Sequence, residues 1–153
     1  MSKSRFLYVT YIRTTPEKLW EALTNPEFTK RYWCEVRNES TWKKDADWKL
    51  VAPDGRVADS GKVLEIDPPR RLVVSWKHEL LPDVRDEVAS RATFELEQAA
   101  DSVKLTVIHE SDVPDSKIIR SVSGGWPAIL ASLKSLLETG AALEVTAKWP
   151  KGM

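Results

Sequence analysis

The sequence contains little of what stabilises an exported protein or holds a protein in a membrane. Cys34 is its one cysteine in 153 residues, so no internal disulfide can form. The first residues, Met1 to Arg5, lead into an alternating segment rather than into the apolar core of a signal peptide. No run approaches the roughly 20 apolar residues that a membrane-spanning helix requires. These absences predict a cytoplasmic protein with no membrane span.

An excess of charge of one sign is also missing. The 23 basic and 23 acidic side chains give a formal net charge of zero, and they are mixed along the chain. A chain without a basic patch has no field that attracts phosphate backbones or anionic lipids. We therefore expect no nucleic-acid partner.

Motifs for metals, nucleophiles and phosphates are absent as well. The chain has two histidines and one cysteine, with no HxxxH or CxxC spacing, so we expect no metal site. No GxSxG turn occurs, and the pair Gly124-Gly125 fits neither GxxxxGK[ST] nor GxGxxG. We therefore expect no cofactor and no intrinsic ATPase activity.

The first third of the chain predicts one strand and two short helices. Residues 6–13 (FLYVTYIR) are β-branched and aromatic, which favours a strand. Thr15-Pro16-Glu17 and Asn25-Pro26-Glu27 each combine an N-cap residue, a proline at the first helical position and an early acid. We expect one short helix after each of these signals.

The middle of the chain has the period of two that is typical of antiparallel strands. This pattern runs through residues 35–98 and is interrupted by turn residues, for example Pro53-Asp54-Gly55. A further strand follows over residues 103–110. One face of the strand at 71–78 carries Leu72, Val74, Trp76 and His78, and one face of the strand at 103–110 carries Val103, Leu105, Val107 and His109. Both histidines therefore lie on otherwise apolar faces, which need a cover.

The last third of the chain supplies that cover as a long amphipathic helix. Its apolar residues recur at spacings of three and four: Trp126, Ile129, Leu130, Leu133, Leu136 and Leu137. Because Pro127 lacks an amide hydrogen, we expect this helix to begin near residues 123–126, and Gly140 is suited to end it. The order of elements predicts a single α+β domain over residues 1–153.

Four segments in this order resemble the family of activator of heat-shock-protein-90 ATPase homologues, within the START-like (SRPBCC) superfamily. They are TTPEKLWEALTNPEFTKRYW, DSGKVLEIDPPRRLVVSW, VKLTVIHESDVP and GGWPAILASLKSLLETG. The resemblance implies a helix-grip fold, in which a curved antiparallel sheet wraps around a long C-terminal helix and encloses a cavity. Because superfamily members include carriers, cyclases, dehydratases and chaperone activators, it does not fix the function.

Aromatic side chains are the first candidates to line such a cavity. Seven tryptophans are an unusual number for this length, and each can fill a core or contact a ligand. Trp76 shares its strand face with apolar residues, and Trp126 lies beside two glycines that permit close approach. Trp33, Trp42 and Trp48 could form the mouth of the cavity. The predicted ligand-binding residues are Trp76, His78, His109, Trp126, Phe94, Trp33 and Trp48.

The two histidines are the candidate polar groups. An apolar pocket that carries a few polar groups is typical of a small-molecule site, and imidazole titrates near neutrality. Each histidine could equally be a hydrogen-bonded structural residue. Glu110 follows His109 directly, but adjacent strand residues face opposite sides of a sheet, so these two side chains form no acid–base pair.

Three functions are consistent with these features. The first is binding of a small, partly apolar or amphipathic molecule in the cavity. The second is a cyclase, dehydratase or hydrolase in which His78 or His109 is a general acid or base, and it would require a second titratable group beside that histidine. The third is a chaperone-linked interaction module, which would require an exposed apolar patch outside the cavity. The sequence favours a binding protein, as a monomer or a homodimer.

Overall fold

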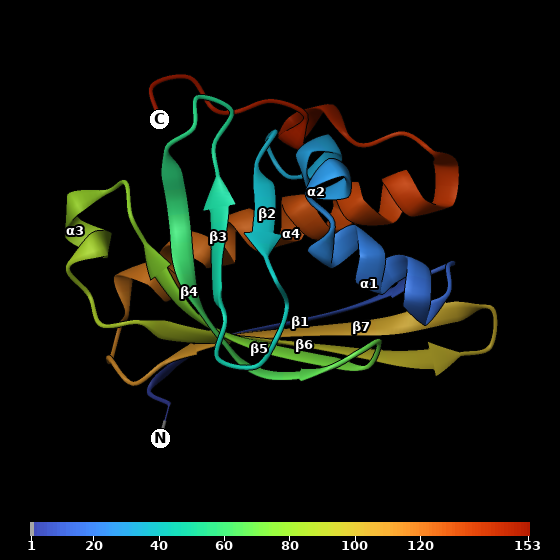
Figure 1. Ribbon diagram of the computed structural model, residues 1–153, viewed down its shortest axis with the longest axis horizontal. Coiled ribbons are helices and arrows are strands. Elements are labelled where there is room, and N and C mark those ends of the chain that lie inside the picture. The colour runs from blue at the N-terminus through green and yellow to red at the C-terminus, as the bar shows by residue number, and fades with distance from the viewer. Residues whose placement is uncertain (1) are drawn as a thin grey trace.

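The computed structural model of the protein describes residues 2–153 and contains a seven-stranded antiparallel sheet (Figure 1). Its strand order is β1-β7-β6-β5-β4-β3-β2. The strands are β1 (Ser4–Ile12), β2 (Arg37–Ser40), β3 (Asp47–Val51), β4 (Val57–Asp67), β5 (Arg71–His78), β6 (Ser90–Ala99) and β7 (Ser102–Ser111). The sheet bends strongly, because β3 and β4 stand upright in Figure 1 whereas β1, β6 and β7 run horizontally beneath them. The predicted helix-grip class is confirmed.

Two short helices follow β1 at the positions that the cap signals predicted. They are α1 (Pro16–Thr24) and α2 (Pro26–Tyr32). The Thr15 hydroxyl accepts a hydrogen bond from the Lys18 amide at 3.2 Å, and the Asn25 side chain accepts one from the Glu27 amide at 2.9 Å. Each cap satisfies a backbone donor that the first helical turn leaves unpaired.

A glycine permits the close approach of three strands where the sheet bends. At Gly61 on β4, an added Cβ would lie 1.9 Å from the Ser75 carbonyl oxygen and 2.7 Å from Nε1 of Trp48. The Trp48 indole crosses this position and donates a hydrogen bond to the Ser75 carbonyl at 2.9 Å. Trp48 is thereby directed onto the inner face of the sheet.

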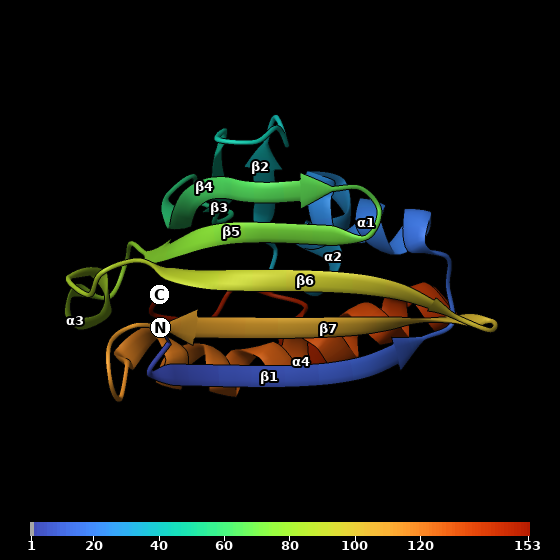
Figure 2. The same cartoon turned by 90° about the horizontal axis from the view of Figure 1, so that it is seen from below.

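The long C-terminal helix α4 (Lys117–Thr139) lies across the inner face, behind the sheet in Figure 2. Leu130 and Leu133 are fully buried, and the helix ends at Gly140, whose φ of 86° is left-handed. The predicted start near residues 123–126 is wrong, because α4 begins at Lys117 and contains Pro127. A proline removes only one intrahelical hydrogen bond, and the first turns of α4 are held by capping contacts.

Those contacts come from Ser116 and from Glu87, which lies in the loop after α3 (Pro82–Arg85). The Ser116 hydroxyl accepts from the Ile119 amide and donates to the Glu87 carboxylate, which in turn accepts from the amides of Lys117 at 2.8 Å and Ile118 at 3.4 Å. Partial burial alone would raise the pKa of Glu87, but these hydrogen bonds outweigh it and lower that pKa.

The chain after α4 returns across the outside of α2 and β2 and includes the short 3-10 helix η1 (Glu144–Thr146). The Cys34 amide donates a hydrogen bond to the Thr146 carbonyl at 2.8 Å, and the Trp149 amide donates one to the Glu35 carboxylate at 3.2 Å. Within residues 2–153, no helix is both long and apolar enough to cross a membrane.

Candidate functional site

An aromatic cluster occupies the space between the bent sheet and α4. Trp76 of β5 lies at its centre, with ring centroids 4.7 Å from Trp48, 5.6 Å from Trp126 and 6.2 Å from Trp33. Phe94 of β6 packs against Trp126 at 5.8 Å. The fold thus brings five of the predicted site residues together, from β3, β5, β6, α4 and the segment after α2.

This cluster fills most of the predicted cavity. Trp33, Trp42, Trp48, Trp76 and Phe94 contribute to the lining of a void of only about 10 Å³, which is room for about one water molecule. Asn38 also lines it, and its buried Oδ1 has no partner among the described residues. Trp33 and Trp48 pack against Trp76 and Trp42 packs against the same core, so at this point the three rings surround only this small void.

His109 is a fully hydrogen-bonded core residue. It is 0% exposed, and its Nδ1 accepts a hydrogen bond from Nε1 of Trp126 at 3.2 Å. The other ring nitrogen therefore carries the hydrogen and donates to the Ser90 hydroxyl at 2.7 Å, and Ser90 donates to the Trp76 carbonyl at 3.2 Å. Burial lowers the pKa of His109 to about 3, so the ring is neutral at neutral pH. This chain of bonds holds β5, β6, β7 and α4 together, and both ring nitrogens of His109 are used in it.

The open pocket lies nearby, between β4, β5 and the first half of α4, and has a volume of about 170 Å³. Its apolar walls are side chains of Trp33, Trp76, Trp126, Ile118, Val122 and Ile129, and its polar groups are Asp59, His78 and Ser121. Ser121 is exposed, so the pocket reaches the surface. Four predicted site residues line it, namely Trp33, Trp76, His78 and Trp126, whereas Trp48, Phe94 and His109 do not.

Asp59 organises the polar end of this pocket. Its Oδ1 accepts a hydrogen bond from Nδ1 of His78 at 3.0 Å and another from Nε1 of Trp76 at 3.0 Å. The Asp59 and His78 side chains are only 15% and 12% exposed. Nε2 of His78 is buried and has no partner within the part of the chain that the structure describes. The site therefore has a fixed imidazole with one unused nitrogen.

Sequence reasoning missed Asp59 and the residues of the first half of α4. Asp59 and His78 are 19 positions apart and become cross-strand neighbours only through the register of β4 against β5. That register includes a shift between Val63 and Glu65, which no local pattern in the sequence indicates. The wall from Ile118 to Val122 was missed because α4 was expected to begin later.

The polar groups of this site can bind a ligand or transfer a proton. Burial, followed by the nearby charge of Glu35, raises the pKa of the Cys34 thiol, which disfavours the reactive thiolate. Across the described residues, 2–153, no three His, Cys, Asp or Glu side chains are grouped so as to hold a metal ion.

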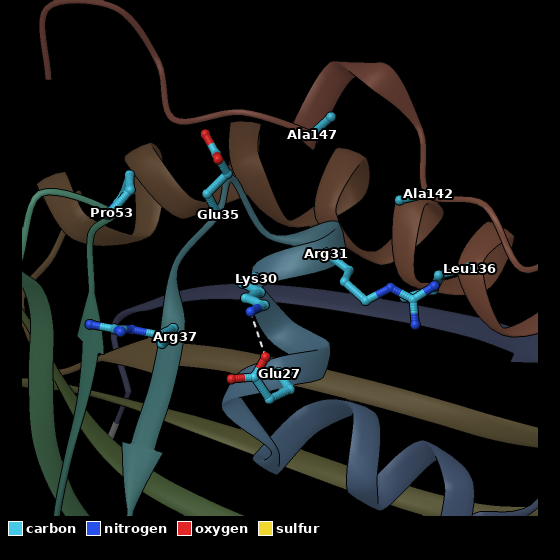
Figure 3. Close-up of a pocket in the computed structure, with 9 residues that line it drawn as sticks. All are labelled: Glu27, Lys30, Arg31, Glu35, Arg37, Pro53, Leu136, Ala142 and Ala147. Atoms are coloured by element: carbon cyan, nitrogen blue, oxygen red, sulfur yellow. Dashed lines mark ion pairs between the residues drawn. The ribbon is translucent and has the colours of Figure 1, made fainter.

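A wider depression lies outside the aromatic cluster, between α2, β2 and the chain after α4 (Figure 3). Its volume is about 610 Å³, and its charged lining residues are Glu27, Lys30, Arg31, Glu35 and Arg37. These side chains are exposed and largely paired on the protein itself, as in the ion pair of Lys30 with Glu27 at 2.5 Å. The depression contains no buried polar atom that lacks a partner, so far as residues 2–153 show. The inner pocket is the better candidate.

An apolar stripe is exposed on the edge strand β1. It consists of Leu7, Val9 and Tyr11, which are 53%, 45% and 52% exposed. Alternate residues of a strand share one face, so the stripe lies on the side of the sheet away from α4. An exposed apolar patch of this kind is the feature that the interaction-module alternative requires.

Comparisons with known proteins agree with this architecture. The family model described as activator of Hsp90 ATPase homolog 1-like protein matches residues 13–138, which is more than half of the chain. No curated protein matches the sequence.

Several solved structures share the fold at low sequence identity. Protein MLL2253 from Mesorhizobium loti is 24% identical, with a TM-score of 0.74 over 88% of this chain and 96% of that one. The HSP90 activator PFC0360w from Plasmodium falciparum is 22% identical, with a TM-score of 0.72 over 88% and 96%. The Aha1 dimer from Colwellia psychrerythraea is 22% identical, with a TM-score of 0.69 over 89% and 97%.

Proposed function

We propose that this chain, which belongs to the family of activator of Hsp90 ATPase homolog 1-like proteins, binds a small, partly apolar molecule in the pocket between β4, β5 and α4. The observation that carries the proposal is the Nε2 atom of His78, which has no partner among residues 2–153 and belongs to a side chain that lines a pocket with apolar walls. Buried polar atoms of proteins nearly always have a partner, and an exception beside a pocket is explained by a bound molecule or water.

The size of the pocket limits the ligand. A cavity of about 150 Å³ holds one benzene ring, so a pocket of about 170 Å³ accepts a single ring with one or two small substituents. The rings of Trp33, Trp76 and Trp126 offer flat apolar surfaces, on which an aromatic or alicyclic ring packs well. A long acyl chain would need more room than this pocket has.

A substitution on α4 that places a side chain in the pocket tests this proposal. Gly125 of α4 lines the pocket, and a Cβ added there would make only an ordinary contact, 3.9 Å from Cδ1 of Ile129. Gly125→Leu should therefore fold and occupy the ligand volume. The neighbouring Gly124 is not among the pocket-lining residues, and a Cβ there meets nothing within 4 Å, so Gly124→Leu is the matched control.

Binding is measured by ligand-observed NMR with phenol as the probe, alongside native mass spectrometry of freshly purified protein. We expect phenol to bind the parent and Gly124→Leu equally and to lose binding to Gly125→Leu. A co-purified molecule, if present, should be lost from the same variant. Equal phenol binding by the parent and Gly125→Leu, or no binding by the parent, would refute the proposal.

A second candidate function is general acid–base catalysis at the same site. The hydrogen bond from His78 to Asp59, at 3.0 Å, is the arrangement in which a carboxylate orients a catalytic imidazole. It supplies the second titratable group that this alternative requires. Conversion of a co-purified molecule by the parent and not by His78→Gln, followed by mass spectrometry, would support catalysis over simple binding.

The interaction-module alternative, with a chaperone as partner, is supported by the apolar stripe on β1 and by family membership. It uses the opposite face of the sheet from the pocket, so the two functions are compatible. Leu7→Lys should weaken partner capture without changing phenol binding.

A further inference from the structure

We infer, resting on the proposed function, that the pocket selects an uncharged ligand that donates a hydrogen bond to Nε2 of His78, which is the chemistry of a phenol, a small aromatic alcohol or an amide.

Asp59 determines which nitrogen of His78 carries the hydrogen. An ionised carboxylate can only accept hydrogen bonds, so the contact of 3.0 Å requires a hydrogen on Nδ1 of His78. In the uncharged imidazole, Nε2 then presents a lone pair and no hydrogen. A ligand that is complementary to this atom must supply an O–H or N–H donor.

The same carboxylate disfavours an anionic ligand. Asp59 is itself part of the pocket wall, and no lysine or arginine of residues 2–153 lines the pocket. When the imidazole of His78 is uncharged, both contacts at Oδ1 of Asp59, from His78 and from Trp76, come from neutral donors and do not neutralise the carboxylate. A carboxylate placed at this end of the pocket would face like charge in a partly desolvated site.

The walls also limit which polar atoms of the protein a bound ring can contact. Trp76 commits its N–H to Asp59 and Trp126 commits its N–H to His109, so neither indole offers a polar group to the ligand. Ser121 is exposed and marks the opening. The acceptors of the wall are Nε2 of His78, the second oxygen of Asp59 and the Ser121 hydroxyl. Among these, within residues 2–153, only Nε2 of His78 is buried and without a partner, so we place the ligand's donor there.

The experiment uses two pairs of probes of matched size at about pH 8, which is above the range where imidazole ordinarily titrates. Phenol and toluene differ in the donor, and benzamide and benzoate differ in charge. The two probes of a pair also differ in how favourably they leave water, and this difference affects their affinities in any pocket. We therefore compare the ratio of the two affinities in the parent with the same ratio in a variant.

We expect His78→Phe to reduce the ratio of phenol to toluene affinity by about tenfold, which is the usual effect of one hydrogen bond. Asp59→Asn keeps a hydrogen-bond acceptor and removes the negative charge. The affinity for benzoate relative to that for benzamide should therefore rise about tenfold in this variant. A measurement on the parent protein alone tests the same point. Phenol should shift the ¹⁵N resonance of His78 Nε2, and toluene should not.

Different results would refute the proposed binding function and the inference about the ligand's donor. Suppose that toluene and phenol both bind the parent and neither binds Gly125→Leu. The pocket then binds ligands. If His78→Phe nevertheless leaves the ratio of phenol to toluene affinity unchanged, and phenol does not move the Nε2 resonance, the inference about the donor is wrong. If benzoate binds the parent as tightly as benzamide, the exclusion of anions is wrong. If no probe binds the parent, the proposed function itself fails.

Discussion

Acidification from about pH 7.5 to about pH 5 should destabilise the protein by about 2 kcal/mol through one residue, the buried His109. In the folded protein its pKa is lowered to about 3, because burial penalises the charged ring. In the unfolded chain an exposed imidazole has a pKa of about 6.5. Between these values the unfolded state binds the additional proton, so stability decreases as pH falls.

The magnitude follows from that difference. Each pH unit below about 6.5 favours the unfolded state by about 1.4 kcal/mol, which gives about 2 kcal/mol at about pH 5. Above about pH 7 the ring is neutral in both states, so the contribution is constant. Carboxylates titrate mainly at lower pH, and the interval between about pH 6.5 and pH 5 therefore reports chiefly on histidine.

Urea unfolding followed by tryptophan fluorescence at several pH values measures this effect. In His109→Asn the slope of stability against pH should be smaller than in the parent by about 1.4 kcal/mol per pH unit over this interval. The variant should also be less stable throughout, because it disturbs the bonds to Trp126 and Ser90. Leu133→Ala, which lowers stability without removing a histidine, is the control and should retain the slope of the parent. Parallel curves for the parent and His109→Asn would refute the reasoning, as would an NMR titration in which His109 of the folded protein protonates near pH 6.

Three further changes should alter stability. Leu133→Ala, in the centre of α4 and fully buried, should cost about 2 to 5 kcal/mol of unfolding free energy, and a loss below about 0.5 kcal/mol would show that α4 does not cover the core. Gly61→Ala should cost at least about 2 kcal/mol in the same urea assay, since its Cβ would overlap the Ser75 carbonyl, while Gly55→Ala, with nothing within 4 Å of its Cβ but a φ of 93°, should cost less. Glu87→Ala should cost about 1 kcal/mol at neutral pH by removing the cap of α4. Because the pKa of Glu87 is lowered in the folded protein, this difference should shrink as the pH falls below about 4, and a constant difference down to about pH 3 would contradict the capping role.

Local patterns were sufficient for most of the secondary structure. The caps at Thr15 and Asn25 and the left-handed end at Gly140 act within a few residues of themselves, so their signals do not depend on the rest of the fold. The start of α4 was misplaced because Pro127 was given more weight than the local N-cap residue Ser116. The second capping group, Glu87, lies about 30 positions earlier in the chain and reaches the helix only in the folded state. A local reading of Pro127 could not include that contact.

The sequence by itself determined the order of the main elements and which residues of α4 and of the strands at 71–78 and 103–110 face the core, because periods of two and of 3.6 are properties of the local backbone. It also placed both histidines on inner faces. Only the tertiary structure decided that His109 is saturated by Trp126 and Ser90 while His78 keeps a free nitrogen beside Asp59. It decided equally that aromatic rings fill most of the space that a cavity could have occupied, leaving about 170 Å³ open. The physical reason is that packing and hydrogen bonding depend on the volumes and registers of segments that are distant in sequence, and neither quantity is encoded in any one of those segments.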